Sequence, residues 1–410
     1  MNRKIKSLGE VVRKKWREKV GSIVKTWGPA WLVMIADVDA ASAITAAESG
    51  AQYGTKLVWF IMILTFPLYV IQEVAGRVGA VTGKGLGELI RLNYSPRTAV
   101  LCSVPMALVD IISYVVEYTG IAVGFEMMGV SPWISVPLAF LAHLIVVYKR
   151  KYIEAEKPLL VISVIFTIVW IVAALLNCRN HRIEITPFYF STSSDFIFML
   201  AANIGAVIMP FMLFYQVSAT AEKGITQDGI WAVRFETMVG ALFSEMIMVA
   251  IAVSAIGIDS VALDFSSPKV LSHSLTSVAG QFAPYAFGIG LVSASFIALI
   301  VISLGSSWGV TEAMGWGRKN WFKVYLVESI PAVIIPLVSY NLIKLALDLM
   351  VLQIAVLIAP AIILGVIASN KKLMGGFILK GLNKYIYWIT VILIFITGVI
   401  SAWPLLEKIG

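Results

Sequence analysis

The residues best suited to chemistry are two aspartates in the middle of an apolar segment. Asp37 and Asp39 lie within residues 31–50, a stretch that contains no Lys or Arg. A charged side chain at the centre of a bilayer costs about 2.5–3.5 kcal/mol on insertion scales, so something must offset that cost. A bound cation is the simplest candidate. The alternative is that the two carboxylates only cap or pair neighbouring helices.

A hard divalent cation prefers oxygen ligands, and two stretches of the chain could supply them. Asp39 and Ser42 are three residues apart, which places them on one face of a helix or at the two sides of a helix break. Pro210 interrupts a second apolar run and would free a backbone carbonyl near Ala206. Met209 would add a thioether, which favours Mn²⁺ or Fe²⁺ over Mg²⁺, unless it is an ordinary packing residue. Mg²⁺ keeps several waters and often touches only one or two carboxylates.

Other polar side chains in the apolar runs have less specific roles. Glu117 could relay protons or cations or make a structural hydrogen bond, and Gln216 could line an inner path. The three histidines are scattered, and His143 suits a buried hydrogen bond better than metal ligation. The sequence contains no nucleophile elbow, phosphate-binding loop or dinucleotide fingerprint, so we expect neither enzyme activity nor a cofactor. The remaining acids in apolar runs suit helix pairing: Asp110, Glu245, Glu312 and Asp348.

The composition is that of a helical membrane protein. The chain has 410 residues, of which 59% are hydrophobic and 14% charged, against about 25% charged in soluble domains. Apolar runs longer than about 18 residues recur along its length, and they are continuous rather than alternating, which excludes a β-barrel. The net charge of +8 would suggest nucleic acid in a soluble protein, but here the basic residues lie between apolar runs. We therefore expect no nucleic-acid partner.

Eleven apolar runs are long enough to be membrane spans. They lie at about residues 28–50, 55–81, 98–128, 132–149, 157–177, 196–222, 232–257, 283–314, 324–341, 345–369 and 384–404. With the N-terminus inside, 25 Lys and Arg residues fall on the inner side and six on the outer side, a strong positive-inside bias. This predicts a cytoplasmic N-terminus and an extracellular C-terminus. Cys102 and Cys178 then lie on opposite faces and cannot pair.

The spans divide into two groups of five with one added. Spans one and six both hold polar or helix-breaking residues at mid-depth, which is typical of inverted-repeat transporters with a site between the repeats. The predicted parts are residues 28–177 for the first repeat, 178–195 for an extracellular loop, 196–369 for the second repeat, and 370–410 for an eleventh helix and tail. Residues 1–27 carry nine basic residues and an apolar stripe, which suits a helix on an anionic membrane surface or a basic tail that sets orientation.

Three segments resemble one family of transporters. Residues 28–54, from Gly-Pro-Ala to Gly-Ala-Gln-Tyr-Gly, resemble the first span of the Nramp divalent-metal transporters. Residues 72–84, QEVAGRVGAVTGK, resemble their second span and inner loop, and residues 205–210, GAVIMP, resemble their sixth span. The resemblance implies an all-α polytopic membrane protein with a LeuT-like fold, an inverted 5+5 repeat plus an eleventh transmembrane helix.

The resemblance also implies a metal site. The family uses an Asp-Pro-Gly-Asn break in span one and a Met-Pro-His motif in span six. Asp39 matches the metal-binding Asp, Ser42 stands in place of the Asn, and Met209 matches the Met. Ala206 matches the residue whose carbonyl binds the metal. Glu117 matches a span-three acid of the proton pathway.

This chain departs from the family pattern in ways that affect the substrate. Ala40 and Ala41 replace the helix-breaking Pro-Gly, and Asp37 stands where an aromatic residue is usual. An added acid and a lost amide suggest a larger, more hydrated and more negative site. The usual proton-carrying groups are replaced by Phe211, Gln216 and Tyr114. This combination resembles the Nramp-related magnesium transporter branch.

The sequence therefore favours an alternating-access carrier for uptake of Mg²⁺ and also Mn²⁺ without proton coupling. The metal residues would be Asp39, Asp37, Ser42, Ala206 and Met209, with Gln216, Glu117 and Phe211 along the path or behind the ligands. The alternative is a proton-coupled Mn²⁺/Fe²⁺ transporter in which Glu117 suffices.

An amino-acid carrier is disfavoured because two aspartates would repel the substrate carboxylate, and mid-membrane acids argue against a non-transporting scaffold or sensor. The expected setting is the plasma membrane of a prokaryote. The expected partners are divalent ions and lipid, and the expected assembly is a monomer.

Overall fold

The computed structural model describes residues 26–148, 186–258, 280–317, 320–337 and 342–407, with parts of residues 161–178 and residues 273 and 276. The basic N-terminal segment lies outside the described residues except for its last two. The predicted fifth span, 157–177, and the predicted extracellular loop, 178–195, are described only in part.

The described residues form an all-α structure, as predicted. The α-helices are α2 (Pro29–Asp37), α3 (Ala40–Tyr53), α4 (Val58–Thr82), α5 (Leu86–Asn93), α6 (Pro96–Met127), α7 (Pro132–Tyr148), α9 (Ser194–Val207), α10 (Pro210–Glu222), α11 (Ile230–Ser254), α13 (Ala283–Met314), α14 (Trp321–Ile334), α15 (Leu342–Ala368), α16 (Lys371–Met374) and α17 (Leu382–Glu407). Short 3-10 turns join them at η1 (Gly54–Leu57), η2 (Gln227–Gly229), η4 (Ile335–Leu337) and η5 (Gly375–Phe377).

The long helices coincide with the predicted spans. Seven helical segments among the described residues are long and apolar enough to cross a membrane, and α7 is a shorter apolar helix. Apart from the partly described fifth span, each predicted span corresponds to a helix or a pair of helices whose ends differ from the prediction by a few residues. The protein is therefore an integral membrane protein. The division of the spans into two repeats remains a prediction.

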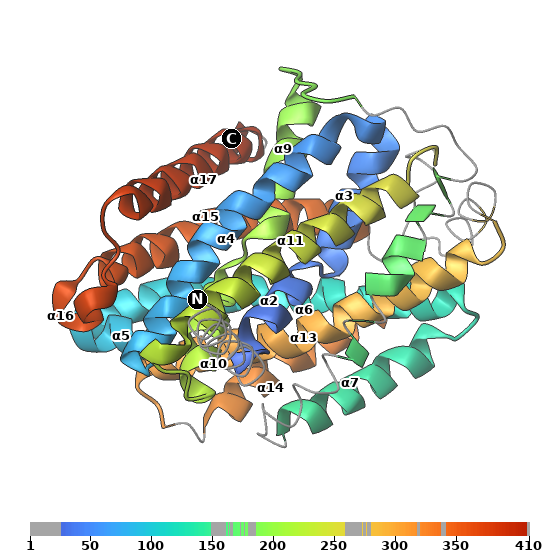
Figure 1. The fold of residues 1–410 in the computed structure, drawn as a ribbon. Helices are drawn as coiled ribbons and strands as arrows, with labels where there is room; N and C mark the ends of the chain where they lie inside the picture. The colour runs from blue at the N-terminus through green and yellow to red at the C-terminus, as the bar shows by residue number, and fades with distance from the viewer. Residues whose placement is uncertain are drawn as a thin grey trace, which may run out of the picture.

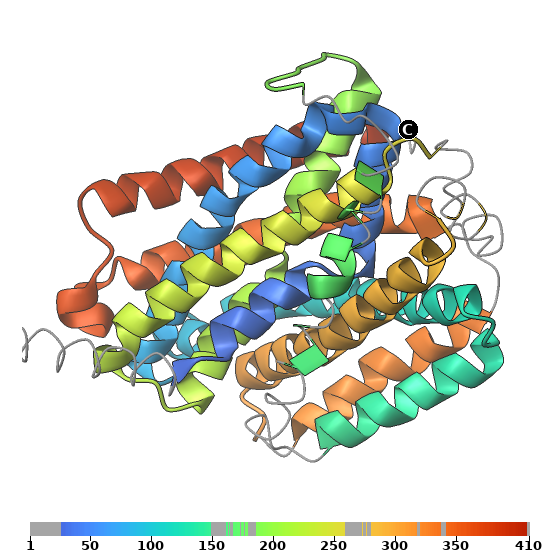
Figure 2. The same cartoon turned by 45° about the vertical axis from the view of Figure 1, so that its right-hand side comes forward.

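The long helices surround two interrupted helices, α2–α3 and α9–α10. Helices α6 and α13 lie along each other, α17 packs on α15 at one flank, and α7 and α14 lie at the opposite flank (Figures 1 and 2). In the interior, every residue of α2 is buried, and in α10 every residue from Pro210 to Thr220 is buried. Helix α2 continues into α3, and α9 continues into α10, each pair separated by two non-helical residues. This burial of interrupted helices positions the candidate site.

Helix α2 is held along α11 in a fixed register. The Glu236 carboxylate accepts hydrogen bonds from the backbone N–H groups of Gly28 (2.6 Å) and Trp31 (2.8 Å) at the start of α2. One helical turn on, Gly240 lies against Met34, and a Cβ at Gly240 would be 2.8 Å from Met34 Cγ. A carboxylate at a helix N-terminus also interacts favourably with the helix dipole. These contacts compensate for the absence of a side-chain cap at Gly28.

The short helix α5 was not predicted. It lies in the loop between the second and third predicted spans and buries Leu86, Leu89 and Ile90. Its apolar residues recur at helical spacing, but eight residues are too few to stand out from a polar loop. Packing against α13 and α6 supplies the stability that so short a helix lacks alone.

Candidate functional site

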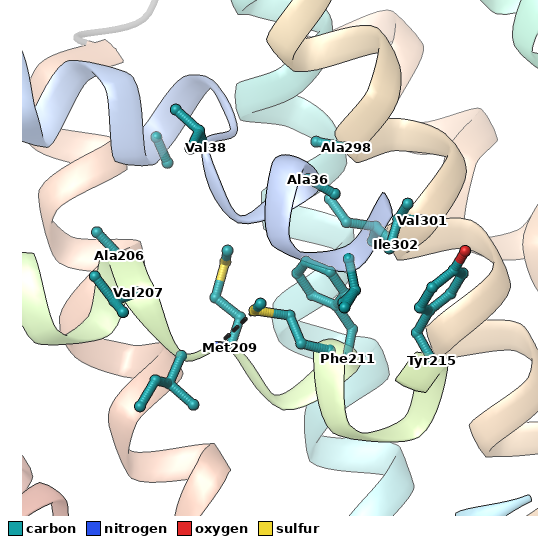
Figure 3. Packing of buried hydrophobic residues seen from close by; sticks show 14 of the residues in the cluster. Ala36, Val38, Ala206, Val207, Met209, Phe211, Tyr215, Ala298, Val301 and Ile302 are labelled. Atoms are coloured by element: carbon teal, nitrogen blue, oxygen red, sulfur yellow. Dashed lines mark hydrogen bonds between the residues drawn. The ribbon is translucent and has the colours of Figure 1, made fainter. Parts of the chain in front are cut away.

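Two helix breaks meet in the centre of the structure. The α2–α3 break consists of Val38 and Asp39, and the α9–α10 break consists of Ile208 and Met209. All four residues are buried. Figure 3 shows the two breaks facing each other, with the Met209 side chain extending from its own break toward the α2–α3 break. Helix breaks at this depth leave backbone groups without intrahelical partners, which is how many carriers bind ions.

The α2–α3 break forms without proline or glycine because two carboxylates cap the new helix start. Asp39 has an extended backbone (φ −81°, ψ −177°), and its Oδ1 accepts the Ser42 N–H at 2.7 Å. Aspartate is among the best N-cap residues. From α6, Glu117 Oε2 accepts the Ala40 N–H at 3.1 Å. The substitution of Ala40 and Ala41 for a Pro-Gly pair is therefore compatible with a break.

Asp39 retains one oxygen that is free to bind a ligand. Its side chain is fully buried, and Oδ2 has no hydrogen-bond partner among the described residues. A buried charge is costly unless it is paired or coordinates a metal. Part of the Asp39 carboxylate therefore builds the break, and the rest is available to a cation.

Ser42 links the two interrupted helices directly. Its hydroxyl donates a hydrogen bond to the Ala206 carbonyl at 2.9 Å, across 164 residues of sequence. The structure thus brings together Asp39, Ser42 and Ala206, three of the residues predicted for the metal site. The Ser42 hydroxyl therefore joins the start of α3 to the end of α9.

Met209 and Phe211 belong to the α9–α10 side of the candidate site. Met209 caps α10, and its N–H lies 3.4 Å from the Met212 sulfur. Figure 3 shows Phe211 on the first turn of α10, on the side of α2 and α13. Pro210 begins α10 at the position that proline favours, which explains why this break could be predicted.

Asp37 has a different environment from Asp39. It is the last residue of α2, and its Oδ2 accepts a hydrogen bond from the Ser244 hydroxyl of α11 at 2.7 Å. Glu245, the next residue of α11, is close enough to interact electrostatically with Asp37. The two aspartates of the sequence motif therefore face different helices.

The remaining predicted residues lie around the site. Glu117 contacts the α2–α3 break through Ala40, as described above. Gln216 is fully buried on α10 and lies against Gly76 of α4, where a Cβ would be 2.7 Å from Gln216 Nε2. Both Gln216 amide atoms lack hydrogen-bond partners among the described residues, as do those of Gln72 one turn along α4 from Gly76. No group of three or more His, Cys, Asp or Glu side chains in the described part of the chain is arranged to hold a metal.

A second polar cluster lies between α6, α7, α13 and α14. His143 hydrogen-bonds to the Tyr118 hydroxyl (2.8 Å) and to Ser303 Oγ (2.7 Å), so it is a buried hydrogen-bonding residue as predicted. Tyr114 donates to Ser303 at 3.1 Å and lies 3.5 Å from the Glu328 carboxylate. Sequence reasoning missed Glu328, because a single acid near the start of a span carries no distinctive pattern.

Sequence reasoning also gave little weight to Glu245 and omitted Ser244. Both face the Asp37 side of the α2–α3 break. Only the register of α2 along α11 brings them there, so no local signal could have indicated their position. By contrast, Glu312 does pair elements as expected, since it accepts hydrogen bonds from Ser218 of α10 (3.0 Å) and from Gly87 N–H of α5 (3.1 Å).

Comparison with protein families matches residues 30–404 to Nramp, described as natural resistance-associated macrophage protein-like. Among solved structures, the chain is similar to a manganese transporter of Eremococcus coleocola, with a TM-score of 0.77 and 16% identity over 93% of this chain and 86% of that chain.

Two further solved structures have the same fold. MhsT, solved with L-phenylalanine, has a TM-score of 0.65 and 12% identity over 91% of this chain and 98% of that chain. Mhp1, a nucleobase-cation-symport-1 family transporter, has a TM-score of 0.57 and 14% identity over 92% of this chain and 91% of that chain. The predicted LeuT-like fold is confirmed.

Proposed function

The chain belongs to the Nramp family of metal transporters, and from this premise we propose that it takes up Mg²⁺ and Mn²⁺ by alternating access without proton coupling. Asp39 is the main ligand, the Ala206 carbonyl is the second, and Ser42 and Met209 shape the cavity between the two breaks. Asp37 increases the negative field. The membership of a transporter family also means that the chain is not an enzyme.

One observation carries this proposal. The Asp39 carboxylate is fully buried at a helix break, one of its oxygens caps α3, and the other has no partner among the described residues. A carboxylate used only as a cap would leave this second oxygen buried without compensation, which is costly. The Ser42–Ala206 hydrogen bond at 2.9 Å joins the α2–α3 break to the end of α9, which supports a shared site at the two breaks.

The sparse set of ligands supports a substrate that keeps its water. Asp39 is the acidic residue within the two breaks themselves, and no group of three or more His, Cys, Asp or Glu side chains in the described part of the chain is arranged to hold a metal. Mg²⁺ sheds its waters reluctantly and is commonly bound through one or two carboxylates. The Met209 thioether beside the site keeps Mn²⁺ as a second substrate, because softer ligands favour transition metals.

The absence of proton coupling is supported by the residues that replace ionisable groups. Phe211 cannot carry a proton, and neither can the Gln216 amide at neutral pH. Both ring nitrogens of the buried His143 are hydrogen-bonded, to the Tyr118 hydroxyl and to Ser303 Oγ. We infer that metal moves through this site without a matching proton.

One contact favours the alternative, a proton-coupled Mn²⁺/Fe²⁺ carrier. Glu117 accepts the Ala40 N–H at the α2–α3 break, so its protonation would weaken the cap of α3 next to Asp39. In that case Glu117 alone would couple proton and metal movement.

Transport into proteoliposomes separates the two functions. The uncoupled Mg²⁺ carrier should show Mn²⁺ uptake that excess Mg²⁺ inhibits, with no acidification of a lumen that holds a pH-sensitive dye. A protonophore added at the end, under an imposed pH gradient, verifies that the dye responds. Mn²⁺ uptake that excess Mg²⁺ leaves unchanged, or that acidifies the lumen, would support the proton-coupled carrier instead.

The orientation and the path also belong to this proposal. We propose a cytoplasmic N-terminus and an extracellular C-terminus, which the 25 to 6 distribution of Lys and Arg supports. We also propose that the chain acts as a monomer in the plasma membrane of a prokaryote. Gln216 and Phe211 lie on α10 beyond Met209, so they border the inner part of the path.

A further inference from the structure

A second pair of buried acids lies beside the α2–α3 break. Asp37 ends α2, and Glu245 lies on α11 next to Ser244, whose hydroxyl bonds to Asp37 Oδ2 at 2.7 Å. Both acids are fully buried, and they are close enough to interact electrostatically. Two like charges at this depth need a shared partner to remain ionised.

The register of α2 along α11 holds this pair in place. Glu236 bonds to both Gly28 and Trp31 at the start of α2, Gly240 lies against Met34, and Ser244 bonds to Asp37 at its end. These contacts recur at each turn of α11, from Glu236 through Gly240 to Ser244, so the end of α2 cannot turn easily toward α9. The Asp37 carboxylate is therefore built to face α11.

Three carboxylate oxygens of the pair lack hydrogen-bond partners among the described residues. They are Oδ1 of Asp37 and both Oε1 and Oε2 of Glu245. A structural acid pair would satisfy its buried oxygens with donors, because an unsatisfied buried acceptor is costly. These oxygens are therefore available to a ligand.

The surrounding described elements offer no basic side chain to this pair. Helices α2 and α3 contain no Lys or Arg. Arg234 of α11 lies three turns away and pairs with Glu73 at 2.7 Å, and Arg77 of α4 pairs with the same Glu73 at 3.1 Å. The C-terminal end of α2 adds a partial negative charge and carbonyls without intrahelical partners. All these features favour a positively charged ligand.

We propose that Asp37, Glu245 and the Ser244 hydroxyl bind a second divalent cation, beside the one at Asp39. The ligand is a hard cation, Mg²⁺ or Mn²⁺, held by carboxylate and hydroxyl oxygens with part of its water retained. This deepens the proposed transport function and rests on it, since it gives the ion two neighbouring positions along its path. The competing explanation is that one or both acids are permanently protonated and only pack the helices together.

Glutamine distinguishes these explanations. It is neutral and has nearly the shape of a protonated glutamate, but it cannot offer an ionised carboxylate to a cation. The probe is Mn²⁺ alone, bound to the purified full-length protein in detergent and measured by equilibrium dialysis. The wild type should bind two Mn²⁺ ions per chain, and Glu245→Gln and Asp39→Asn should each bind one. The remaining site of Glu245→Gln should be lost when Asp39→Asn is added.

Further variants and a stability control separate the loss of a metal ligand from a failure to fold. Glu245→Asp retains the charge, so it should still bind two ions, the second at least about tenfold more weakly. Ser244→Ala removes one ligand and should weaken the same ion. Thermal melting without metal checks that each variant is folded. Binding of two ions by Glu245→Gln, or of one ion by both the wild type and Glu245→Gln, would overturn the second site.

The outcome is separable from that of the transport proposal. Mn²⁺ uptake into proteoliposomes by a protein that binds one ion supports the carrier and refutes the second site. Two bound ions without any uptake would refute the carrier while leaving two cation sites.

Discussion

Replacing Gly120 by alanine tests the contact between α6 and the α2–α3 break. A Cβ added at Gly120 would lie 2.7 Å from the Ala40 Cβ and 2.5 Å from Ser295 Oγ. Carbon atoms in contact prefer about 3.5–4.0 Å, so α6 must move away from the start of α3. Glu117 lies one turn earlier on α6 and accepts the Ala40 N–H at 3.1 Å. The same movement therefore lengthens the hydrogen bond that caps α3.

The two effects set the size of the change. Overpacking of a close contact costs about 1–3 kcal/mol, and a hydrogen bond to a charged group contributes about 1.5–3 kcal/mol. They do not add, because the movement relieves the clash by stretching the bond. We expect a cost of about 2 kcal/mol, which corresponds to about a 30-fold loss if it falls wholly on the transport-competent arrangement of Asp39.

The assay is the initial rate of Mn²⁺ uptake into proteoliposomes, together with the thermal stability of the purified variant. Gly317→Ala is the matched control, because a Cβ there meets no atom within 4 Å. Gly120→Ala should lose uptake and stability while Gly317→Ala resembles the wild type. A Gly120→Ala protein that transports and melts like this control would refute the reasoning about the break.

Two further substitutions probe the anchors of the interrupted helices. Glu236→Gln weakens the charge-assisted hydrogen bonds at the start of α2. Hydrogen exchange of the amides in the first turn of α2 should therefore accelerate, by about tenfold for a loss of about 1.4 kcal/mol. Unchanged exchange would show that α11 does not hold α2 there. Ser42→Ala removes the hydrogen bond to the Ala206 carbonyl and should lower the free energy of unfolding by about 0.5–1.5 kcal/mol in metal-free protein. Chemical unfolding measures this loss, and a stability equal to that of the wild type would mean that the bond contributes nothing.

The positions of the spans could be predicted because each requires a long apolar run and the chain has little else. The break in α9–α10 was also predictable, since Pro210 cannot continue a helix without losing a hydrogen bond. The break in α2–α3 was less visible. Its cause is the N-cap Asp39 together with Glu117 of α6, and the second of these is 77 residues away from its partner.

The partner of Asp37 could not be predicted for a similar reason. Ser244 is 207 residues away from Asp37, and only packing of α2 on α11 joins them. In the sequence, Asp37 and Asp39 look like one motif because they are two residues apart. A helix end between them turns the two carboxylates toward different neighbours, and no local pattern indicates that turn.

The most direct test of the central claim is Mg²⁺ and Mn²⁺ uptake by Asp39→Asn. Asparagine caps helices about as well as aspartate, so the variant keeps the α2–α3 break and removes only the charge. Asp195→Asn, in the exposed first turn of α9, is the matched control for loss of one carboxylate. The account predicts that Asp39→Asn folds like the wild type and transports neither ion, while Asp195→Asn transports both. Undiminished uptake by folded Asp39→Asn would contradict it.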